Sequence, residues 1–315
     1  MGNIERGQTE LNIDVSVVVA SYNPVIDKMR FTLDSIVEQI GVGFEIVIAD
    51  DGSQDNKVDW IIQYMERYPN VDYKLVIHQC NQGTVLNVLD GVNACRGRYI
   101  KLISPGDGLY NNSTLHDWSE KLSSSGYKWS FGDAVNYVRN SNDTLEYVPM
   151  KAFPQMVGHY NIKNKKKCRW DYLILDDQIL GAATLCCKEL LLEYLRKLSK
   201  RVIYAEDNSY RIMMFDGIVP YYYNKVVIKY EFGEGISTSA SDEWNRRLDE
   251  DLEETEKIMF EGMNVEDRFQ QKVRRAYAIK YKGSRIRRIL NRAIRNKGIY
   301  FMLKKKINMR MTEVE

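Results

Sequence analysis

Short apolar runs alternate with amphipathic segments along the first hundred residues of the chain. Four runs have the length and the near-continuous Val and Ile content of strands that are buried on both faces: 15–21, 44–50, 73–79 and 98–104. Between them, apolar residues recur at helical spacing within 33–40, 58–65 and 85–92. Strands that alternate with helices form βαβ units. We therefore predict an α/β fold with a mostly parallel central sheet flanked by helices.

The pattern is less regular after residue 110. Strands are expected within 128–138, 179–187 and 221–232, and a helix is expected near 188–199. The lysine-rich segment 161–170 is interpreted as a basic loop, and residues 242–256 are acidic and helix-prone. We divide the chain into a ligand-binding and catalytic domain at 1–240, an acidic helical linker at 241–270 and a basic helical tail at 271–315.

The composition is that of a globular protein with a hydrophobic core, since 44% of the 315 residues are hydrophobic and 28% are charged. No apolar run reaches the length of about 18 residues that a membrane-spanning helix requires. The first residues do not have the pattern of a signal peptide. The five cysteines, without CxxC spacing, indicate reduced thiols rather than a disulfide framework or a zinc site. These features together predict a cytoplasmic protein.

The net charge of +2 is unevenly distributed along the chain. Residues 271–310 contain 15 Lys and Arg and no Asp or Glu, whereas residues 1–270 contain 30 basic and 41 acidic residues. Apolar residues at 286, 289, 290, 293 and 294 form one helical stripe among arginines. This pattern favours binding to an anionic membrane surface, at the inner face of the plasma membrane. Packing of the tail on the acidic body is the alternative, and nucleic acid is not expected because stacking aromatics are lacking.

Small, polar or acidic residues follow each of the four predicted strands. The segments are ASYNP at 20–24, DDGS at 50–53, QCNQG at 79–83 and SPGDG at 104–108. Ligands of open α/β sheets bind outside the carboxyl ends of the strands, so we expect a binding site here. Each segment could also be a turn only. Neither GxGxxG nor GxxxxGK[ST] is present, which argues against a dinucleotide-binding Rossmann domain or a P-loop.

Asp107 stands between two glycines directly after the fourth predicted strand. Its carboxylate is suited to a divalent cation, which would balance the charge of a diphosphate in place of a glycine-rich loop. We expect Gly106 and Gly108 to let a metal-bound diphosphate approach the backbone closely. The alternative is a simple Pro-Gly-Asp-Gly turn.

The strand-end segments, followed by AEDNSYR at 205–211, resemble the motifs of family 2 glycosyltransferases, which are inverting enzymes with a GT-A fold. The resemblance covers residues 14–240 and is strongest to enzymes of bacterial capsule and cell-surface polysaccharide assembly. It implies a hexosyl- or N-acetylhexosaminyl-transferase with a nucleotide-sugar donor such as a UDP-sugar. It also implies Mn²⁺ or Mg²⁺ as cofactor and a saccharide or lipid-linked acceptor.

The resemblance further implies roles for single residues. Tyr22 would stack on the uracil, Asp51 would meet the base edge, and the donor site would comprise Ala20, Tyr22, Asn23, Asp51, Ser53 and Gly106. Asp107 would coordinate the metal, and Asp207 would be the catalytic base with Glu206 beside it. The sequence departs from the family at Gly106, where many members carry an acid. It also lacks a histidine in 229–239, where some relatives place a further metal ligand.

Two functions are compatible with these features. The first is an inverting glycosyltransferase, in which Asp207 takes the proton of the acceptor hydroxyl and the metal stabilises the leaving diphosphate. The second is a non-catalytic scaffold that binds a nucleotide-sugar at the membrane surface. The two hypotheses differ at Asp207, which a binding protein does not need.

Overall fold

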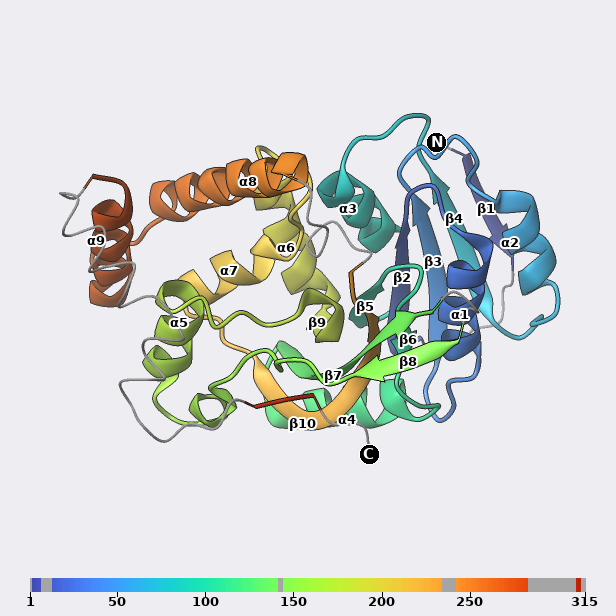
Figure 1. Cartoon of the computed structure of the whole chain (residues 1–315), viewed down its shortest axis with the longest axis horizontal. Helices are drawn as coiled ribbons and strands as arrows, with labels where there is room; N and C mark the ends of the chain where they lie inside the picture. The colour runs from blue at the N-terminus through green and yellow to red at the C-terminus, as the bar shows by residue number, and fades with distance from the viewer. Residues whose placement is uncertain (1, 7–12, 141–143, 234–241, 283–309, 313–315) are drawn as a thin grey trace.

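A computed structural model describes residues 2–6, 13–140, 144–233, 242–282 and 310–312. In this part of the chain ten strands form one mixed sheet, in the order β1-β4-β3-β2-β5-β9-β7-β10-β6, with β8 beside β7 (Figure 1). The strands are β1 (Gly2–Arg6), β2 (Val15–Ser21), β3 (Phe44–Asp50), β4 (Asp72–Ile77), β5 (Tyr99–Ile103), β6 (Gly108–Leu109), β7 (Trp129–Arg139), β8 (Leu145–Val148), β9 (Thr184–Cys187) and β10 (Tyr221–Glu231).

Helices cover both faces of this sheet. They are α1 (Ile26–Val37), α2 (Val58–Met65), α3 (Thr84–Ala94), α4 (Thr114–Ser125), α5 (Lys165–Ile174), α6 (Lys188–Leu198), α7 (Asn208–Phe215), α8 (Asp242–Glu261) and α9 (Arg268–Lys282), with short 3-10 helices η1 (Val157–His159) and η2 (Gly181–Ala183). Figure 1 shows α5 to α9 gathered at one end of the molecule and α1 and α2 at the other. The α/β class predicted from the sequence is confirmed.

The parallel half of the sheet is formed by β4, β3, β2 and β5, which pair in register as neighbours. Successive side chains of a strand point to opposite faces, so Val15, Val17 and Val19 of β2 join the apolar cluster under α1, α2 and α4. Val18 points the other way, into the cluster under α3 and α6. Both faces are therefore buried, which is why the strand sequences are apolar without alternation.

The second half of the sheet is mixed. β9 pairs antiparallel with both β5 and β7, and β7 and β10 pair in parallel. The basic segment 161–170 is not a loop over its whole length, because α5 begins at Lys165. The Asn164 side chain accepts a hydrogen bond from the backbone N–H of Lys166 and so caps this helix. Cys168 and Tyr172 of this helix are buried in the core, whereas the three lysines in its first turn are exposed.

The acidic and basic C-terminal segments contribute side chains to the core. Met259 of α8 and Val273 and Tyr277 of α9 are buried in the same apolar cluster as α5, α6 and α7. The boundary expected between residues 270 and 271 falls inside α9. None of the helices that the structure describes combines the length and the apolar character needed to cross a membrane.

Tyr277 joins α9 to the body through its hydroxyl group, and its replacement by phenylalanine should destabilise the protein. The hydroxyl accepts a hydrogen bond from Arg211 at 2.9 Å and donates one to the carbonyl of Leu173 at 2.9 Å. Loss of this buried partner should lower the free energy of unfolding by about 1–3 kcal/mol. Urea denaturation would measure the change. The matched variant Tyr22→Phe, at an exposed ring, should change it by less than about 0.5 kcal/mol. Equal stabilities of the two variants would contradict this role.

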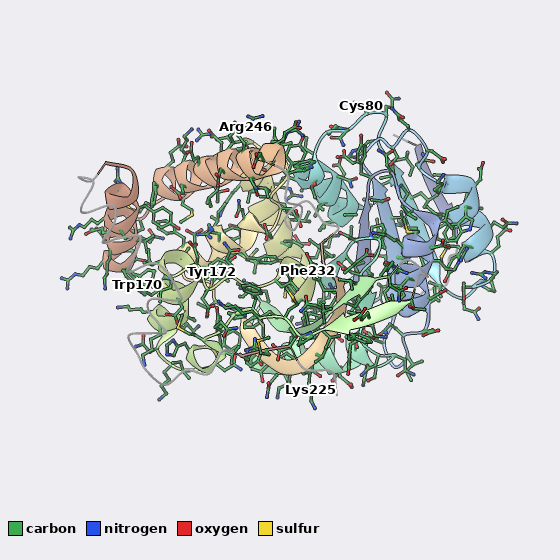
Figure 2. The ribbon with its side chains drawn as sticks, viewed as in Figure 1. Cys80, Trp170, Tyr172, Lys225, Phe232 and Arg246 are labelled. Atoms are coloured by element: carbon green, nitrogen blue, oxygen red, sulfur yellow. The ribbon has the colours of Figure 1, made fainter. Side chains whose placement is uncertain are left out.

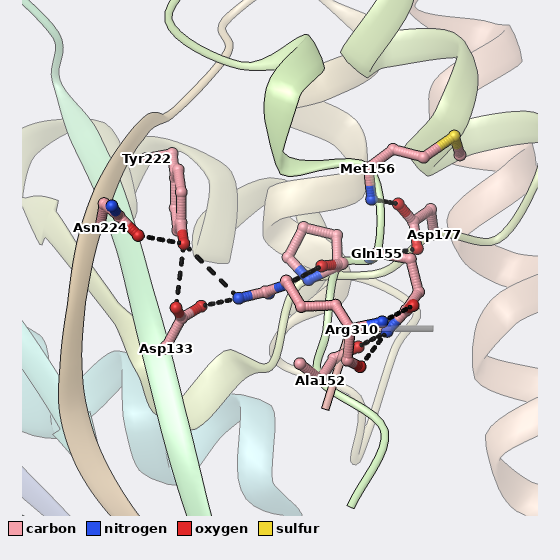
Figure 3. A network of polar contacts seen from close by, with 9 residues as sticks. Asp133, Ala152, Gln155, Met156, Asp177, Tyr222, Asn224 and Arg310 are labelled. Atoms are coloured by element: carbon pink, nitrogen blue, oxygen red, sulfur yellow. Dashed lines mark hydrogen bonds and ion pairs between the residues drawn. The ribbon is translucent and has the colours of Figure 1, made fainter. Parts of the chain in front are cut away.

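Residues 310–312 lie on the body and pair with 150–152 through a β-bridge between Lys151 and Met311. Arg310 makes an ion pair with Asp133 of β7, with 2.6 Å between Nη1 and Oδ1 (Figure 3). The same carboxylate accepts a hydrogen bond from the hydroxyl of Tyr222 in β10. This segment is thus tied to both β7 and β10.

Candidate active site

The loops after β2 and β3 are held against each other by the residues expected to bind the nucleotide. The backbone N–H of Asn23 donates to the hydroxyl of Ser53 at 2.6 Å, and the amide oxygen of Asn23 accepts from the N–H of Gln54. Asp50 fixes this turn by accepting hydrogen bonds from the N–H and the hydroxyl of Ser53. Tyr22 lies beside them with 53% of its surface exposed, so one face of its ring is open to a ligand.

Asp51 joins this rim to the loop after β4. Its carboxylate, which is 4% exposed, accepts hydrogen bonds from the backbone N–H groups of Gln82 and Gly83. Buried His78 lies behind it, with 3.6 Å between Nδ1 and the Asp51 oxygen. Gly52 is in direct contact with the backbone of Cys80, whose side chain is exposed at the edge of the molecule (Figure 2). The ends of β3 and β4 thus form one surface.

Hydrogen bonds from α1 and β7 hold the loop that carries Asp107. The hydroxyl of Thr32 donates to the carbonyl of Asp107 at 2.7 Å and accepts from the N–H of Gly106. Tyr137 of β7 donates its hydroxyl hydrogen bond to the carbonyl of Gly106. Asp107 is 6% exposed, so it lies deeper than a surface turn would place it.

The two glycines are required by neighbouring side chains of the protein itself. Gly106 has φ +109°, and a Cβ there would overlap the carboxylate of Glu231. A Cβ on Gly108 would lie 2.8 Å from the ring of Phe31. Glu231 and Phe31 thus take the space beside the two glycines, and the close approach of a metal-bound diphosphate to this loop stays a prediction.

Lys101 and Asp107 are two buried ionisable residues in and directly after β5, and each charge acts on the other. Burial raises the pKa of Asp107 to about 7, although a hydrogen bond from the N–H of Glu231 and the charge of Lys101 act against this. Burial also lowers the pKa of Lys101 to about 7. The Lys101 ammonium group donates to the carbonyls of Leu102 and Ala182, and the second of these belongs to η2.

The residues around Asp107 fit a divalent cation that arrives with its ligand. No group of three or more His, Cys, Asp or Glu side chains in the described part of the chain is arranged to hold a metal. One or two carboxylates with phosphate oxygens are, however, the usual ligands of Mg²⁺. Asp107 uses Oδ1 for the hydrogen bond from Glu231, and Glu231 brings a second carboxylate close by.

Glu206 and Asp207 lie at the start of α7, in a turn that α8 holds in place. The carboxylate of Asp251 in α8 accepts hydrogen bonds from three successive backbone N–H groups, those of residues 203, 204 and 205. Asp207 occupies the N-cap position of α7, but its side chain makes no capping hydrogen bond. The turn is therefore held by a neighbouring helix.

Burial raises the pKa of both acids in this turn. The pKa of Glu206 rises to about 8, through burial first and the charge of Asp207 second. The pKa of Asp207 rises for the same first reason, while the charge of Arg211 acts against the rise. A carboxylate with a raised pKa is a better proton acceptor near neutral pH than an ordinary aspartate.

Two short contacts connect this turn to the rest of the site. A Cβ on Gly181 of η2 would lie 3.1 Å from the Cβ of Asp207, and the next residue, Ala182, accepts the hydrogen bond from Lys101. The N–H of Val85 donates to the carbonyl of Ile203, which links α3 to the same turn. η2 thus contacts both Asp207 and Lys101, and the charge of Lys101 acts on Asp107.

Three residues of this site were not among those predicted: Lys101, Glu231 and Asp251. A signal existed for Glu231, because a glycine in place of the family's acid indicates that something else occupies that space. Residues 234–239 of the segment without a histidine, and the apolar stripe at 286–294, lie outside the described residues.

A model of the family described as "Glycosyl transferase family 2" matches residues 16–173. The chain is similar to "Uncharacterized glycosyltransferase YibD" of Escherichia coli (strain K12), with 32% identity over 96 residues that cover 30% of this chain and 27% of the relative. It is 25% identical over 178 residues to a "PGL/p-HBAD biosynthesis glycosyltransferase" of Mycobacterium bovis, which covers 50% of this chain and 68% of that protein. The chain thus spans less than a third of the first relative.

The fold is also similar to solved structures. The S. aureus TarS 1-349 complex with UDP aligns with a TM-score of 0.57 and 12% sequence identity, over 93% of this chain and 78% of TarS 1-349. The complex of the same protein with UDP-GlcNAc aligns with a TM-score of 0.57 and 15% identity, over 94% and 77%. At these identities the likeness concerns the fold.

Proposed function

The chain belongs to glycosyl transferase family 2, and from this membership we propose that it is an inverting glycosyltransferase. It moves a sugar from a nucleotide-sugar, most simply a UDP-sugar, to a hydroxyl group of a saccharide or a lipid-linked acceptor. The observation that carries the proposal is that η2 lies against Asp207 and accepts a hydrogen bond from Lys101, whose charge acts on Asp107. Two carboxylates at one sheet edge are what a leaving group and an acceptor on opposite sides of a sugar require.

The donor side of the site comprises the rim formed by the loops after β2, β3 and β4. The exposed ring of Tyr22 offers a stacking surface for a base. The hydrogen bond between Asn23 and Ser53 holds the loop that carries Tyr22 against the loop that carries Asp51. Fold neighbours of this chain were solved with UDP and UDP-GlcNAc, which supports a nucleotide-sugar as the donor. Asp107, with Mn²⁺ or Mg²⁺ when bound, would stand at the diphosphate, where the metal would stabilise the developing charge.

The acceptor side is the turn of Glu206 and Asp207. Asp207 is the proposed base that removes the proton of the acceptor hydroxyl as the new bond forms. Its raised pKa suits this role, because the proton must be accepted near neutral pH. Glu206 stands next to it, and burial, with the charge of Asp207, raises the pKa of Glu206 to about 8.

A non-catalytic nucleotide-sugar-binding scaffold is the second candidate function. It accounts for the donor rim equally well, but it gives no reason for two half-buried acids in a turn held by three hydrogen bonds to Asp251. Burying two carboxylates costs stability unless a function compensates for it.

Donor binding and transfer can be tested in one series. Thermal stability is measured with UDP-sugars, other nucleotide-sugars and free nucleotides, with Mn²⁺ and with EDTA. A ligand present at about 100 times its Kd stabilises the folded state by about 2.7 kcal/mol, so a true donor is readily seen. Release of UDP with the selected donor and a panel of saccharide acceptors then distinguishes the enzyme from the scaffold. Donor binding without any release of UDP would favour the scaffold.

We further propose that the basic C-terminal segment brings the active site to an anionic membrane surface at the cytoplasmic face. Within the described residues, Lys272, Arg274 and Arg275 of α9 are exposed, while Val273 and Tyr277 hold the helix on the body. Each basic residue near an anionic surface contributes about 1 kcal/mol of binding, so several together suffice for attachment.

Replacing five arginines by glutamine, at positions 285, 287, 288, 292 and 295, should weaken binding to anionic vesicles by at least about tenfold at low salt. Co-sedimentation with phosphatidylglycerol vesicles would measure the loss. The control variant replaces the exposed lysines at 163, 165, 166 and 167 by glutamine and should bind as the unmodified protein does. If the arginine variant binds equally well, or the unmodified protein never binds, the membrane role is wrong.

A further inference from the structure

The geometry points to Glu231, Lys28 and Arg139 as binding residues for the metal-diphosphate group of the donor. Glu231 would act with Asp107 toward the metal, and the two cations would act toward the phosphates. In the donor-free protein these groups neutralise one another. The inference rests on the proposed function and assigns three residues to the site that neither the motifs nor the family resemblance names.

Glu231 occupies the position that a side chain at residue 106 would take. Its Oε2 lies where a Cβ on Gly106 would stand, and its backbone N–H donates to Asp107 at 3.0 Å. Its own side chain is 6% exposed. Glu231, the last residue of β10, therefore places a carboxylate beside Gly106, where many family members carry an acid in the loop itself.

Two cations from different elements hold this carboxylate. Lys28 of α1 contacts Oε2 at 2.9 Å, and Arg139 at the end of β7 contacts Oε1 at 3.2 Å. Arg139 also lies over the ring of Phe31, with 5.1 Å to its centroid. The Lys28 carbonyl accepts a hydrogen bond from the N–H of Gly106, so the loop is bonded to the residue that carries this cation.

These four side chains match the charges of a metal-bound diphosphate. A diphosphate diester carries two negative charges and its metal two positive charges, and the site offers two cations and two carboxylates at one place. When the donor binds, the phosphates take over Lys28 and Arg139, and Glu231 turns its oxygens to the metal beside Asp107. Hard cations favour carboxylate oxygens, and Lys and Arg favour phosphates.

This exchange predicts effects of opposite sign for one substitution. Glu231→Gln should lower the affinity for UDP in Mn²⁺ by about tenfold, because a metal ligand is lost. In EDTA the same variant should bind UDP about two- to fivefold more tightly, because the two cations no longer have to leave an ion pair. Titration calorimetry measures both affinities, and the electron paramagnetic resonance signal of free Mn²⁺ measures metal binding in the presence of UDP.

Lys28→Gln completes the test, since Lys28 is partly exposed and its loss should not prevent folding. It should weaken UDP binding about two- to fivefold with and without metal. Neither variant should change the affinity for uridine, which has no phosphates. The matched control is Glu45→Gln. Glu45 is a buried carboxylate paired with Arg96 at the start of β3, whereas the proposed site lies at the carboxyl ends of the strands, so this variant should leave UDP affinity unchanged.

The inference is overturned if Glu231→Gln lowers UDP affinity equally in Mn²⁺ and EDTA, or changes neither. It is also overturned if Lys28→Gln binds UDP as the unmodified protein does. Failure of the unmodified protein to bind UDP or any other nucleotide would instead refute the proposed function. The two failures are therefore distinguishable in the same titrations.

Discussion

Replacing Asp207 by asparagine should abolish most of the transfer activity and leave donor binding intact. Asparagine has nearly the same shape but cannot accept the proton of the acceptor hydroxyl. A positioned general base contributes about 10²–10⁴-fold to the rate, and kcat should fall by that factor. The rate of UDP release at saturating donor and acceptor measures the loss, and calorimetry measures donor affinity.

The same substitution at Asp216, at the other end of α7, provides the matched control. Asp216 accepts a hydrogen bond from Tyr194 and takes no part in the site, so Asp216→Asn should retain activity. In the unmodified protein, activity should fall as the pH drops through the pKa of Asp207, which burial raises above its ordinary value. Near-normal turnover of Asp207→Asn would refute the assignment and direct attention to Glu206.

Replacing Asp107 by asparagine should remove the metal-dependent part of UDP binding. Even the loss of a group that only supports a metal ligand lowers metal affinity about 10–100-fold, so affinity in Mn²⁺ should fall at least tenfold. Affinity in EDTA should change little. The side-chain oxygen of asparagine can still accept the hydrogen bond from the N–H of Glu231, so the loop should keep its shape. Calorimetry in both buffers checks this result.

The stability of this variant supplies an independent check. The folded protein binds the Asp107 proton more tightly than the unfolded chain, because its pKa is about 7 against an ordinary value of 3.8. The ionisation of Asp107 therefore lowers stability as the pH rises from about 4 to about 7. The asparagine variant lacks this loss. The difference in free energy of unfolding between the variant and the unmodified protein should therefore favour the variant more at pH 7.5 than at pH 4.5. Unchanged UDP affinity in Mn²⁺ would refute the metal role.

The parallel half of the fold could be predicted almost to the residue because its signals are local. The runs at 15–21 and 44–50 coincide with β2 and β3, since strands covered on both faces need apolar residues throughout. The helix at 165–174 was missed because its exposed lysines dominate the composition of the segment. Only the Asn164 cap and the buried Cys168 and Tyr172 reveal it.

Only those candidate site residues that lie together in one continuous segment of the sequence could be predicted. The residues at 20–23, 50–53, 106–107 and 206–207 follow strands or begin a helix, so their motifs are visible in the sequence. Glu231 reaches Asp107 only because β10 pairs with β6, the short strand that directly follows Asp107, and Asp251 reaches the turn at 203–205 only through the packing of α8. Neither contact has a local signal, since each joins residues more than 40 positions apart.

Cys80 is a natural site for attaching a fluorescent label, because its thiol is exposed in the unmodified sequence. Of the five thiols, three are buried and Cys187 is half-buried, which leaves Cys80 as the one exposed to a reagent. A maleimide fluorophore would attach there first, next to the Gly52 turn and within the rim proposed to receive the nucleotide. Its emission would then follow donor binding in real time, in the native sequence and in every variant described above.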